Sequence, residues 1–478
     1  MTEKKMPPCM SNCPAHINIR EALNFIKQKK FLDAINLVKK NLPLPASIAR
    51  ICPHPCEFNC TRKFKDGAIN IHQIRIFLAD MFLSNKFDFE RKKNVKPQKK
   101  ICIIGAGPAG ISCAYFLSLC GHRIFIFDQM SEPGGMLKYG VPEYRLPKKI
   151  LNREINFFDE LKIDFIGNIK IDKKKFEELK NRFDAIILAI GAWKAKKIKC
   201  VGEENFYDGI EFLRNIELNK KEMEKMVDGK KIAVIGGGNT AIDICRSAIR
   251  LNAKEVINIY RRTKNEMPAE ISEINDAIDE GVVFKELLSP VKILCDNENK
   301  KVLFMEKYKL GEKDFDGRAS IIKTNEILTE KFDLIILAIG QDVEADFFNG
   351  EKNPDGTIKI NDCFETSEKK IFCIGDARRN KNRIAVNAIA DAKKVCEHVN
   401  NFLLGEELIC KEKVDGDEKI NSQAKAKFEN TRLEMKKRKA CERKKDFDEI
   451  ILPWSEKEFL QEANRCLNCG GCKKNDCN

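Results

Sequence analysis

Two stretches of the chain repeat one order of short apolar strand, glycine-rich turn and helix. The strands are residues 100–104 (KICII) and 231–235 (KIAVI), and glycine turns follow at residues 105 and 236. Each unit also holds a later apolar strand, AIILAIG at residues 185–191 and LIILAIG at residues 334–340. Continuous apolar strands that alternate with helices are typical of doubly wound sheets. The pattern predicts an α/β fold with two Rossmann-like dinucleotide-binding domains.

The segments on either side of these units have other patterns. Apolar residues recur at helical spacing between residues 19 and 38, which predicts a small helical domain before the first unit. Residues 87–100 predict a linker, and residues 371–375 a strand that returns to the first sheet. A Lys/Glu-rich stretch to about residue 448 precedes a capping-box pattern, Ser455 to Glu458, which predicts a last helix. The predicted domains are 1–90, 99–192 with 346–408, 193–345 and 411–478.

Composition narrows the class of protein. A chain of 478 residues exceeds what one core usually supports, so several domains are expected. No apolar run is long enough to span a bilayer, and the first residues lack the apolar core of a secretion signal. We therefore expect a cytoplasmic protein without membrane insertion. The net charge of +14 comes from scattered lysines without interleaved aromatics, which favours a solvated surface, or docking of an acidic protein, over nucleic acid.

The first glycine turn, GAGPAG at residues 105–110, fits the GxGxxG fingerprint between a strand and a helix. The next strand, residues 123–127, ends in Asp128, at the place where an acid binds an adenosine ribose. A second glycine pair ends at Gly135, and a late strand ends in Gly375 and Asp376, which could bind a flavin ribityl chain if the chain returns to this sheet. These features predict an FAD site. Its candidate residues are Gly105, Gly107, Pro108, Ala109, Gly110, Asp128, Gln129, Gly135, Met136, Leu137, Arg145, Gly375 and Asp376.

The second glycine turn, GGGNTA at residues 236–241, fits the GxGxxA variant. Its next strand, residues 255–260, ends in Arg261 and Arg262 instead of an acid. Paired guanidinium groups suit a 2′-phosphate, which favours NADPH over NADH; the alternative is a solvated strand end. The candidate residues are Gly236, Gly237, Gly238, Asn239, Thr240, Ala241, Arg261, Arg262 and Gly340. Two nucleotide sites imply hydride transfer between cofactors, for which no catalytic side chain is needed.

Nine cysteines are spaced as in metal or cluster sites. Short intervals allow thiolates to converge on one inorganic cluster, and nine suffice for two [4Fe-4S] clusters. Zinc is the main alternative for the C-terminal set. The candidate ligands are Cys9, Cys13, Cys52, Cys56, Cys60, Cys466, Cys469, Cys472 and Cys477. Other cysteines, such as Cys102, Cys113, Cys120, Cys245 and Cys373, are expected to be small apolar residues.

Together these segments resemble the small (beta) subunit of NADPH-dependent glutamate synthase. They also resemble the N-terminal half of dihydropyrimidine dehydrogenase and the large subunit of NADH-dependent ferredoxin:NADP oxidoreductase. The resemblance is carried by CPAHINI (13–19), ICPHPCEFNC (51–60), GAINI (67–71), GAGPAG (105–110), GGMLKYGVPEYRLPKKIL (134–151), GGGNTAID (236–243), YRR with EMPAE (260–270) and IGDARR (374–379).

The resemblance implies FAD at the first glycine turn, NADPH at the second and two four-iron clusters. Relatives place a CxxC pair before the position of Cys9, and here Cys466 and Cys469 look like that pair moved to the other end. One cluster would then use Cys9, Cys60, Cys466 and Cys469. The other takes three cysteines and a Gln or Glu in relatives, but Arg75 stands at that position, so Cys472 or Cys477 could serve instead.

The sequence thus predicts an NADPH-dependent oxidoreductase of the glutamate synthase small-chain type that passes electrons to a partner protein. The partner would be a glutamate synthase large subunit or a ferredoxin-like acceptor. The alternatives are a ferredoxin-linked NAD(P)H oxidoreductase of bifurcating or transhydrogenase type, and a redox-sensing subunit that keeps the nucleotide folds.

Overall fold

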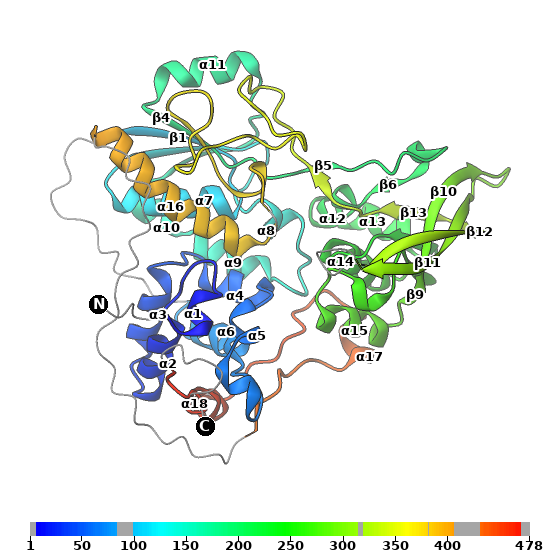
Figure 1. Ribbon diagram of the computed structural model, residues 1–478, viewed down its shortest axis with the longest axis horizontal. Helices are drawn as coiled ribbons and strands as arrows, with labels where there is room; N and C mark the ends of the chain where they lie inside the picture. Colours follow the sequence, from blue (N-terminus) through cyan, green and yellow to red (C-terminus); the bar gives the residue numbers. More distant parts are fainter. Residues whose placement is uncertain (1–5, 84–98, 314–318, 381, 406–430, 470–478) are drawn as a thin grey trace.

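The computed structural model describes residues 6–83, 99–313, 319–380, 382–405 and 431–469 (Figure 1). It contains two five-stranded parallel sheets, a three-stranded antiparallel sheet and a helical N-terminal unit. Figure 1 shows the helical unit below the first parallel sheet, with the second parallel sheet forming a separate lobe on the right. The predicted α/β class with two Rossmann-like domains is confirmed.

The N-terminal unit is made of short helices around one apolar core. They are α1 (Pro8–Ser11), α2 (Ile19–Lys27), α3 (Phe31–Lys39), α4 (Pro45–Ile51), α5 (Pro55–Phe58), η1 (Thr61–Phe64) and α6 (Ile71–Met81). The apolar pattern of residues 19–38 forms two helices, because the chain turns at Lys29, whose φ is +57°. The predicted linker at residues 87–100 lies mostly outside the described residues.

The first parallel sheet has the order β15-β4-β1-β2-β3. Its strands are β1 (Lys100–Ile104), β2 (Arg123–Phe127), β3 (Asp164–Ile166), β4 (Ala185–Leu188) and β15 (Ile371–Cys373). Ile101 and Ile103 pack into the core shared with α7 (Pro108–Leu119) and α16 (Ala385–Leu404), whereas Cys102 packs toward α11 (Lys173–Arg182). Because β1 is buried on both faces, nearly all its residues are apolar. The late strand β15 pairs with β4, so the chain returns to this sheet.

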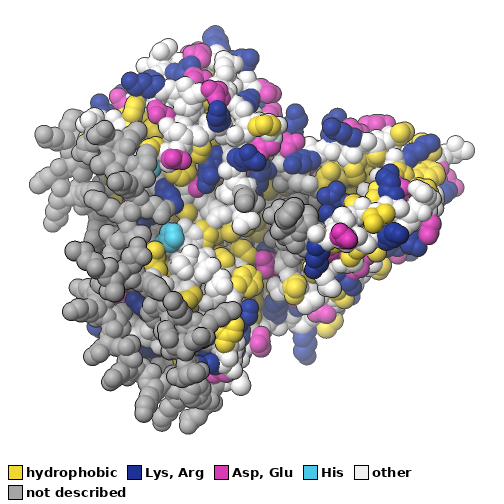
Figure 2. All heavy atoms as spheres, viewed as in Figure 1, with side chains coloured by type: hydrophobic (Ala, Val, Ile, Leu, Met, Phe, Trp, Pro, Cys, Tyr) yellow, Lys and Arg dark blue, Asp and Glu magenta, His cyan; other side chains and the backbone are white. Residues whose placement is uncertain are grey.

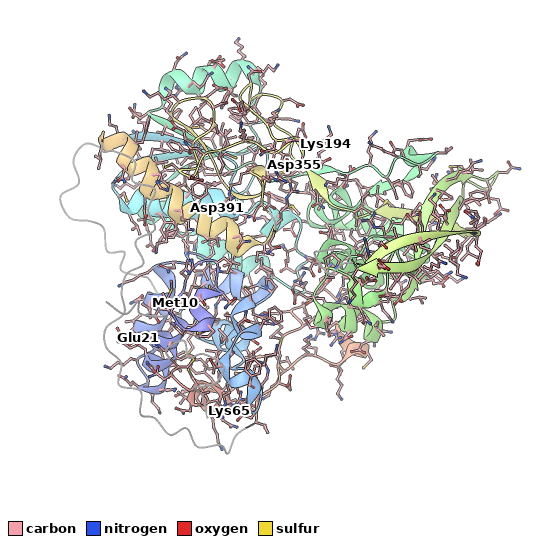
Figure 3. All side chains as sticks on the ribbon, viewed as in Figure 1. Met10, Glu21, Lys65, Lys194, Asp355 and Asp391 are labelled. Carbon is pink, nitrogen blue, oxygen red and sulfur yellow. The ribbon has the colours of Figure 1, made fainter. Side chains whose placement is uncertain are left out.

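Three shorter helices connect β2 and β3: α8 (Met136–Tyr139), α9 (Lys148–Ile155) and α10 (Phe157–Leu161). The chain then crosses to the second lobe and back through an antiparallel pair, β5 (Lys194–Ala195) and β14 (Gln341–Asp342). Figure 3 labels Lys194 at this crossing, between the first sheet and the second lobe. The two parallel sheets are thus connected by β5 and β14, which lie side by side.

The second parallel sheet has the order β6-β13-β7-β8-β9. Its strands are β6 (Tyr207–Asp208), β7 (Lys231–Ile235), β8 (Glu255–Tyr260), β9 (Val283–Glu286) and β13 (Leu334–Leu337). Helices cover one face: α12 (Gly209–Leu218), α13 (Lys220–Val227), α14 (Asn239–Arg250) and α15 (Ile271–Glu280). The remaining short turns of the chain are η2 (Glu203–Asn205), η3 (Lys264–Glu266) and η4 (Gly375–Ala377).

An antiparallel sheet, which the sequence analysis did not predict, covers the other face of this sheet. Its strands are β10 (Leu288–Cys295), β11 (Lys301–Lys313) and β12 (Ala319–Phe332). Ile293, Leu303 and Met305 pack against Ile257 and Ile259 of β8. Apolar residues on one side of a sheet thus replace the helices that usually cover this face.

The C-terminal segment runs from the helical unit to the second lobe and back, since Arg432 pairs with Glu57 and Arg443 with Glu280. It contains α17 (Ala440–Arg443) and α18 (Glu456–Asn464), and Ser455 and Glu458 form the predicted capping box. Phe459 of α18 packs against Phe31 and Phe77, with ring centroids 5.7 and 4.5 Å apart. Figure 1 shows the red α18 beside the blue helices. Residues from the two ends of the chain therefore share one core.

The surface carries charges of both signs. Figure 2 shows Lys and Arg side chains interspersed with Asp and Glu over both lobes, and the face is hollowed between the lobes. None of the described helices combines the length and apolarity that a membrane crossing requires.

Candidate functional site

A cavity of about 260 Å³ lies where the two nucleotide-binding units and the helical unit meet. The first unit supplies most of the predicted FAD residues, namely Gly105, Gly107, Pro108, Ala109, Asp128, Gly135, Met136, Leu137, Arg145, Gly375 and Asp376. The second unit supplies Asn239 and Thr240 at the start of α14, and the helical unit supplies Ile51 and Pro53. All three units thus reach one space, which we call the junction cavity.

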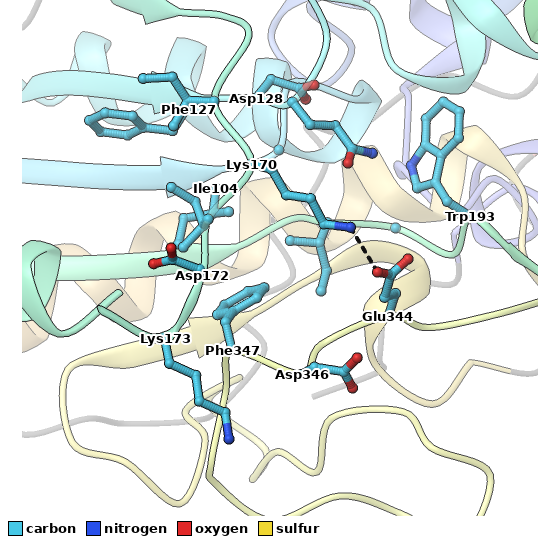
Figure 4. A pocket seen from close by; sticks show the side chains of 16 residues that line it. Ile104, Phe127, Asp128, Lys170, Asp172, Lys173, Trp193, Glu344, Asp346 and Phe347 are labelled. Carbon is cyan, nitrogen blue, oxygen red and sulfur yellow. Dashed lines mark hydrogen bonds and ion pairs between the residues drawn. The ribbon is translucent and has the colours of Figure 1, made fainter. Parts of the chain in front are cut away.

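A second cavity of about 550 Å³ adjoins the junction cavity and shares Gly105, Asp128 and Trp193 with it. Figure 4 shows Asp128 and Trp193 on one side of this space and Phe347 and Glu344 on the other. Gln129, a predicted residue, also lines it, and Lys170 pairs with Glu344 at 2.9 Å across its edge. The two cavities form an elongated site that follows the carboxyl ends of the first sheet, where dinucleotides bind in such folds.

Glycine is required at two points of the first turn. A Cβ at Gly110 would lie 1.9 Å from the carbonyl oxygen of Gly105, so the helix could not pack against the strand. Gly135 has a φ of +53°, and a Cβ there would lie 2.5 Å from the Cα of Gly107. The two glycine loops thus touch backbone to backbone, and both line the junction cavity. This close approach leaves room for a ligand that a larger residue would exclude.

Asp128 and Asp376 lie at the ends of β2 and β15. The carboxylate of Asp128 accepts hydrogen bonds from the backbone N–H of Ala106 at 2.6 Å and of Met130 at 2.7 Å. Burial raises its pKa, and the two N–H groups oppose that rise. Burial also raises the pKa of Asp376, which Arg383 opposes. Each carboxylate oxygen of Asp128 keeps a lone pair for a ribose hydroxyl.

The turn that carries Asp376 is fixed by α16. Asp391, labelled in Figure 3, accepts a hydrogen bond from the Gly375 N–H at 3.1 Å. It also pairs with Arg378, whose Nε lies 2.7 Å away. The Gly-Asp turn is therefore held against the first glycine loop, although more than 260 residues separate them.

The second glycine turn leads from β7 into α14. The Tyr260 ring packs over Gly237, where a Cβ would meet it at 2.5 Å, but no atom lies within 4 Å of the place for a Cβ at Gly238. Asn239 does not point freely outward, because its Oδ1 accepts a hydrogen bond from the Glu270 N–H at 3.0 Å. The remaining predicted residues of this turn are Gly236, Thr240 and the buried Ala241.

The paired arginines at the end of β8 differ in their surroundings. Arg261 is exposed, whereas the half-buried Arg262 donates from Nε to the Ala319 carbonyl at 2.9 Å. Gly340, the last predicted residue, has a φ of +110° and lies beside the crossing strands, with Lys196 as its neighbour. Arg261 is thus the arginine available to a ligand without loss of a contact inside the protein.

An ion pair that the sequence analysis missed joins the two nucleotide-binding units. Arg145 donates to Asp243 of α14 at 2.7 Å, and both are buried and line the junction cavity. Glu273 of α15 lies 3.7 Å from Arg145 and also pairs with Arg246. Burial raises the pKa of Asp243 to about 6, and Arg145 opposes that rise. The Arg145 side chain is therefore bound to Asp243 of the second unit, and its guanidinium is not free in the cavity.

The predicted cysteine ligands fall into two groups. Burial raises the pKa of the Cys9 thiol, and its neighbours Cys466, Cys469 and Cys60 raise it further. The C-terminal pair is held in place from α2, because Lys27 donates to the Cys466 carbonyl at 2.9 Å. The structure thus brings the two ends of the chain together at one group of four thiols.

The second group consists of Cys13, Cys52 and Cys56, which are all buried. Burial raises the pKa of Cys13 and Cys56, and the nearby Arg75 opposes this for both thiols. Cys52 lies between Ile51 and Pro53, so this group is next to the junction cavity. Cys472 and Cys477 lie outside the described residues.

Within the described ranges, no three His, Cys, Asp or Glu side chains close around a single metal ion. The other cysteines behave as predicted, since Cys102, Cys113, Cys245 and Cys373 are buried, and Cys120 is half-buried. Burial raises the pKa of the Cys245 thiol to about 12, which makes it a poor nucleophile or ligand.

Comparison with known proteins places these units in families. Residues 99–392 match the family model of pyridine nucleotide-disulphide oxidoreductases, and residues 2–87 match dihydropyrimidine dehydrogenase domain II, 4Fe-4S cluster. The chain resembles the beta subunit of the NADPH-Fe(3+) oxidoreductase of Geobacter sulfurreducens, with 38% identity over 72% of this chain and 52% of that protein. It also resembles the glutamate synthase [NADPH] small chain of Escherichia coli, with 30% identity over 83% of this chain and 89% of that protein.

The fold also resembles that of a solved structure, FprA of Mycobacterium tuberculosis in complex with NADPH. The TM-score is 0.57 at 17% identity, over 65% of this chain and 85% of that chain. The chain spans about half the length of several curated relatives that it matches, such as the Geobacter protein. The FAD, NADPH and 4Fe-4S cofactors expected from the sequence are those of these families. The chain belongs to the pyridine nucleotide-disulphide oxidoreductases, in the branch of NADPH-dependent flavin and iron–sulfur enzymes that includes the glutamate synthase small chain.

Proposed function

We propose that this chain is an electron-input unit that takes electrons from NADPH and delivers them through iron–sulfur clusters to a partner protein. When bound, FAD supplies the chemistry that accepts a hydride and releases single electrons. The observation that carries the proposal is the junction cavity. It is lined by the first glycine loops, by Asn239 and Thr240 of the second unit, and by Ile51 and Pro53 on either side of Cys52.

The elongated site along the first sheet fits FAD. The glycine loops leave a cradle that a Cβ at Gly110 or Gly135 would destroy. Asp128 would bind the adenosine ribose from the 550 Å³ cavity, and Asp376 would bind the ribityl chain. The flavin ring would then lie in the junction cavity, where Arg145 fixes the facing unit through Asp243.

The second unit would bind NADPH at the start of α14. The open space at Gly238 allows a pyrophosphate to approach the N-terminus of this 12-residue helix. Arg261 would bind the 2′-phosphate, because its guanidinium is exposed, while Arg262 also supports Ala319. Hydride transfer needs the two rings to meet at a fixed distance, and the pair of Arg145 and Asp243 would set that distance.

The cysteine groups fit iron–sulfur clusters better than zinc. A structural zinc ion needs four ligands at about 2.0–2.3 Å, but the described side chains do not close around one ion. An iron–sulfur cluster is larger than a zinc ion, so its cysteine ligands are neighbours but do not surround one metal ion. We assign Cys9, Cys60, Cys466 and Cys469 to one cluster, and Cys13, Cys52 and Cys56 to the other. The second cluster would lie nearer the flavin, because Ile51 and Pro53, on either side of Cys52, line the junction cavity.

A partner protein would receive the electrons. Several relatives are named as subunits, including a glutamate synthase small chain and the beta subunit of an NADP(+)-dependent formate dehydrogenase in Moorella thermoacetica, at 32% identity. A glutamate synthase large subunit is therefore one candidate, and a ferredoxin-like acceptor is the other. Clusters built on so many free thiols suit a reducing compartment, so we place the protein in the cytoplasm.

Substitution of one ligand tests this relay. We expect anaerobic NADPH to bleach the flavin of Cys52→Ser, while the clusters of this variant are no longer reduced at the wild-type rate. Cys441→Ser, which changes an exposed cysteine outside both groups, is the matched control and should behave as wild type. Cluster reduction in Cys52→Ser at the wild-type rate would refute the proposed path.

A further inference from the structure

Arg75 is a buried cation without a carboxylate partner. Its side chain leaves α6 with 8% of the residue exposed, and its Nε and Nη2 have no hydrogen-bond partner. In the part of the chain that the structure describes, no Asp or Glu forms an ion pair with it. A buried guanidinium without compensating charge costs several kcal/mol. A neighbouring anion would therefore stabilise this side chain.

Arg75 lies on α6, which packs against α4, and its neighbour Ile74 shares one buried core with the thiols of Cys13, Cys52 and Cys56. Arg75 opposes the rise in the pKa of both Cys13 and Cys56, which means that its charge is felt at both sulfurs. The nearby acidic side chains are already engaged. Asp80, further along α6, pairs with Arg50 at 2.8 Å, and Glu57 pairs with Arg432 at 2.8 Å. Among the described residues, the cysteine group is thus the remaining source of counter-charge for Arg75.

Neutral thiols would leave the guanidinium uncompensated. Three thiolates that hold an iron–sulfur core carry net negative charge, and the free N–H groups of Arg75 can donate to its sulfurs. A guanidinium has no lone pair to offer to iron, so Arg75 cannot itself be a ligand. The buried cation and the three thiols therefore fit an anionic cluster. Arg75 would supply a positive charge beside this cluster and would form no bond to iron.

We propose, on the basis of the function proposed above, that Cys13, Cys52 and Cys56 hold a cluster with one iron lacking a protein ligand, and that Arg75 is its counter-cation. That iron is the one lost on oxidation. With ferricyanide, [4Fe-4S]2+ gives [3Fe-4S]+, Fe2+ and ferrocyanide, while the four sulfides and three thiolate bonds remain.

The position of this cluster gives the counter-cation a role in the relay. The cluster adjoins the junction cavity through Ile51 and Pro53, so it would be the first acceptor of electrons from the flavin. A buried positive charge stabilises the reduced, more negative cluster and therefore raises its reduction potential. Arg75 would thus favour electron transfer from the flavin to this cluster.

The full-length protein, purified anaerobically, tests this with three measurements: the ratio of iron to sulfide, the electron paramagnetic resonance spectrum after ferricyanide oxidation, and the cluster potentials. We expect the wild type to show a three-iron signal from one of its two clusters. Arg75→Cys should suppress this signal and shift the potential of that cluster downward. Arg75→Lys, which keeps the charge, should resemble the wild type, and Lys63→Gln is an exposed control in the same unit.

Two results would overturn the inference. One is a wild-type protein whose two clusters both keep four irons, with potentials that Arg75→Cys leaves unchanged. The other is a three-iron signal that appears only in Cys472→Ser or Cys477→Ser, because a thiol of the tail would then be the fourth ligand. A protein without iron would instead contradict the proposed function itself.

Discussion

Arg145 donates to both carboxylate oxygens of Asp243, at 3.0 and 2.7 Å, across the boundary between the two nucleotide-binding units. Arg145 follows α8 of the first unit, and Asp243 lies in the first turns of α14 of the second. Both side chains are buried beside the space where the two cofactors would meet. Buried ion pairs contribute little net stability but can fix a unique arrangement. We therefore interpret this pair as the contact that sets the orientation of the second unit.

Removal of the charge of Asp243 should slow hydride transfer. In Asp243→Asn, Arg145 keeps only the more distant Glu273, so we expect a loss of about 1–3 kcal/mol in unfolding free energy. Flavin bleaching by NADPH should slow by about tenfold or more, since the rings are no longer held in position. Stopped-flow absorbance and denaturant titration measure the two effects.

The control for this variant is Lys307→Gln, which removes an exposed ion pair with Glu326 on the outer sheet. An exposed pair contributes at most about 1 kcal/mol to stability. This pair joins β11 and β12 of the antiparallel sheet, which belongs to neither parallel sheet. If Asp243→Asn bleaches its flavin as fast as the control, the pair does not orient the units.

Two glycine substitutions should separate the two nucleotide sites. Gly110→Ala places a Cβ 1.9 Å from the Gly105 carbonyl oxygen, so we expect the purified protein to lose most of its flavin. Gly238→Ala meets no protein atom within 4 Å, so the variant should fold and keep FAD. Its methyl group would instead meet the bound nucleotide, and the KM for NADPH should rise about tenfold, as for a loss of about 1.4 kcal/mol. Normal flavin content in Gly110→Ala would show that the first turn does not hold the cofactor.

The two glycine turns could be read from the sequence because each depends on a few adjacent residues. Strand β8 has the predicted bounds, and the strand predicted at residues 371–375 pairs with the first sheet. The pair of Arg145 and Asp243 could not be found this way, because 98 residues separate its members and neither belongs to a glycine fingerprint. The sequence did mark each residue separately, because Arg145 was a candidate FAD residue and Asp243 ends the segment GGGNTAID.

The antiparallel sheet and the break after α2 escaped prediction for other reasons. Strands β11 and β12 are long and largely exposed, with apolar residues such as Leu310 and Ile322 on the surface, so they show no clean alternation. The break at Lys29 has neither glycine nor proline to mark it, although the residue adopts a left-handed conformation. In both places tertiary packing, and not the local pattern, decides the structure.

Arg261 should determine the preference for NADPH. Its exposed guanidinium can bind a 2′-phosphate, and a charge-assisted hydrogen bond contributes about 1.5–3 kcal/mol. Arg261→Ala should therefore lower kcat/KM for NADPH by roughly tenfold to a hundredfold and leave that for NADH unchanged. Arg262→Ala should also lower stability, because Arg262 supports the Ala319 carbonyl. Equal rates with both nicotinamides in the wild type, unaffected by either change, would rule out this assignment.

Lys148 should make the free energy of unfolding depend on pH in the alkaline range. It donates to the carbonyls of Leu137 and Val141, which line the junction cavity. Burial lowers its pKa from 10.5 to about 8, against the opposing effect of Glu217 and Glu143. Between these values the unfolded chain binds a proton that the folded chain has lost, so this group makes the folded state more stable as pH rises through the window.

The expected gain in unfolding free energy from Lys148 is at most about 3.4 kcal/mol between about pH 8 and 10.5. Lys148→Met has no such group and should not show this gain. The Tm of the wild type should therefore rise relative to the Tm of Lys148→Met as pH increases. Lys307→Gln again provides the exposed control. Parallel Tm curves for the wild type and Lys148→Met across this range would show that the lysine does not titrate there.

In the proposed function, one chain carries electrons from NADPH through a flavin to iron–sulfur clusters. The most direct test is an anaerobic titration of the purified protein with NADPH, followed by visible absorbance, after flavin, iron and inorganic sulfide have been quantified. We predict one flavin and roughly eight inorganic sulfides per chain, as two four-sulfide clusters require, with bleaching of the flavin and then of the clusters. Flavin without iron and sulfide, zinc in place of iron, or a flavin that NADPH fails to reduce would contradict it.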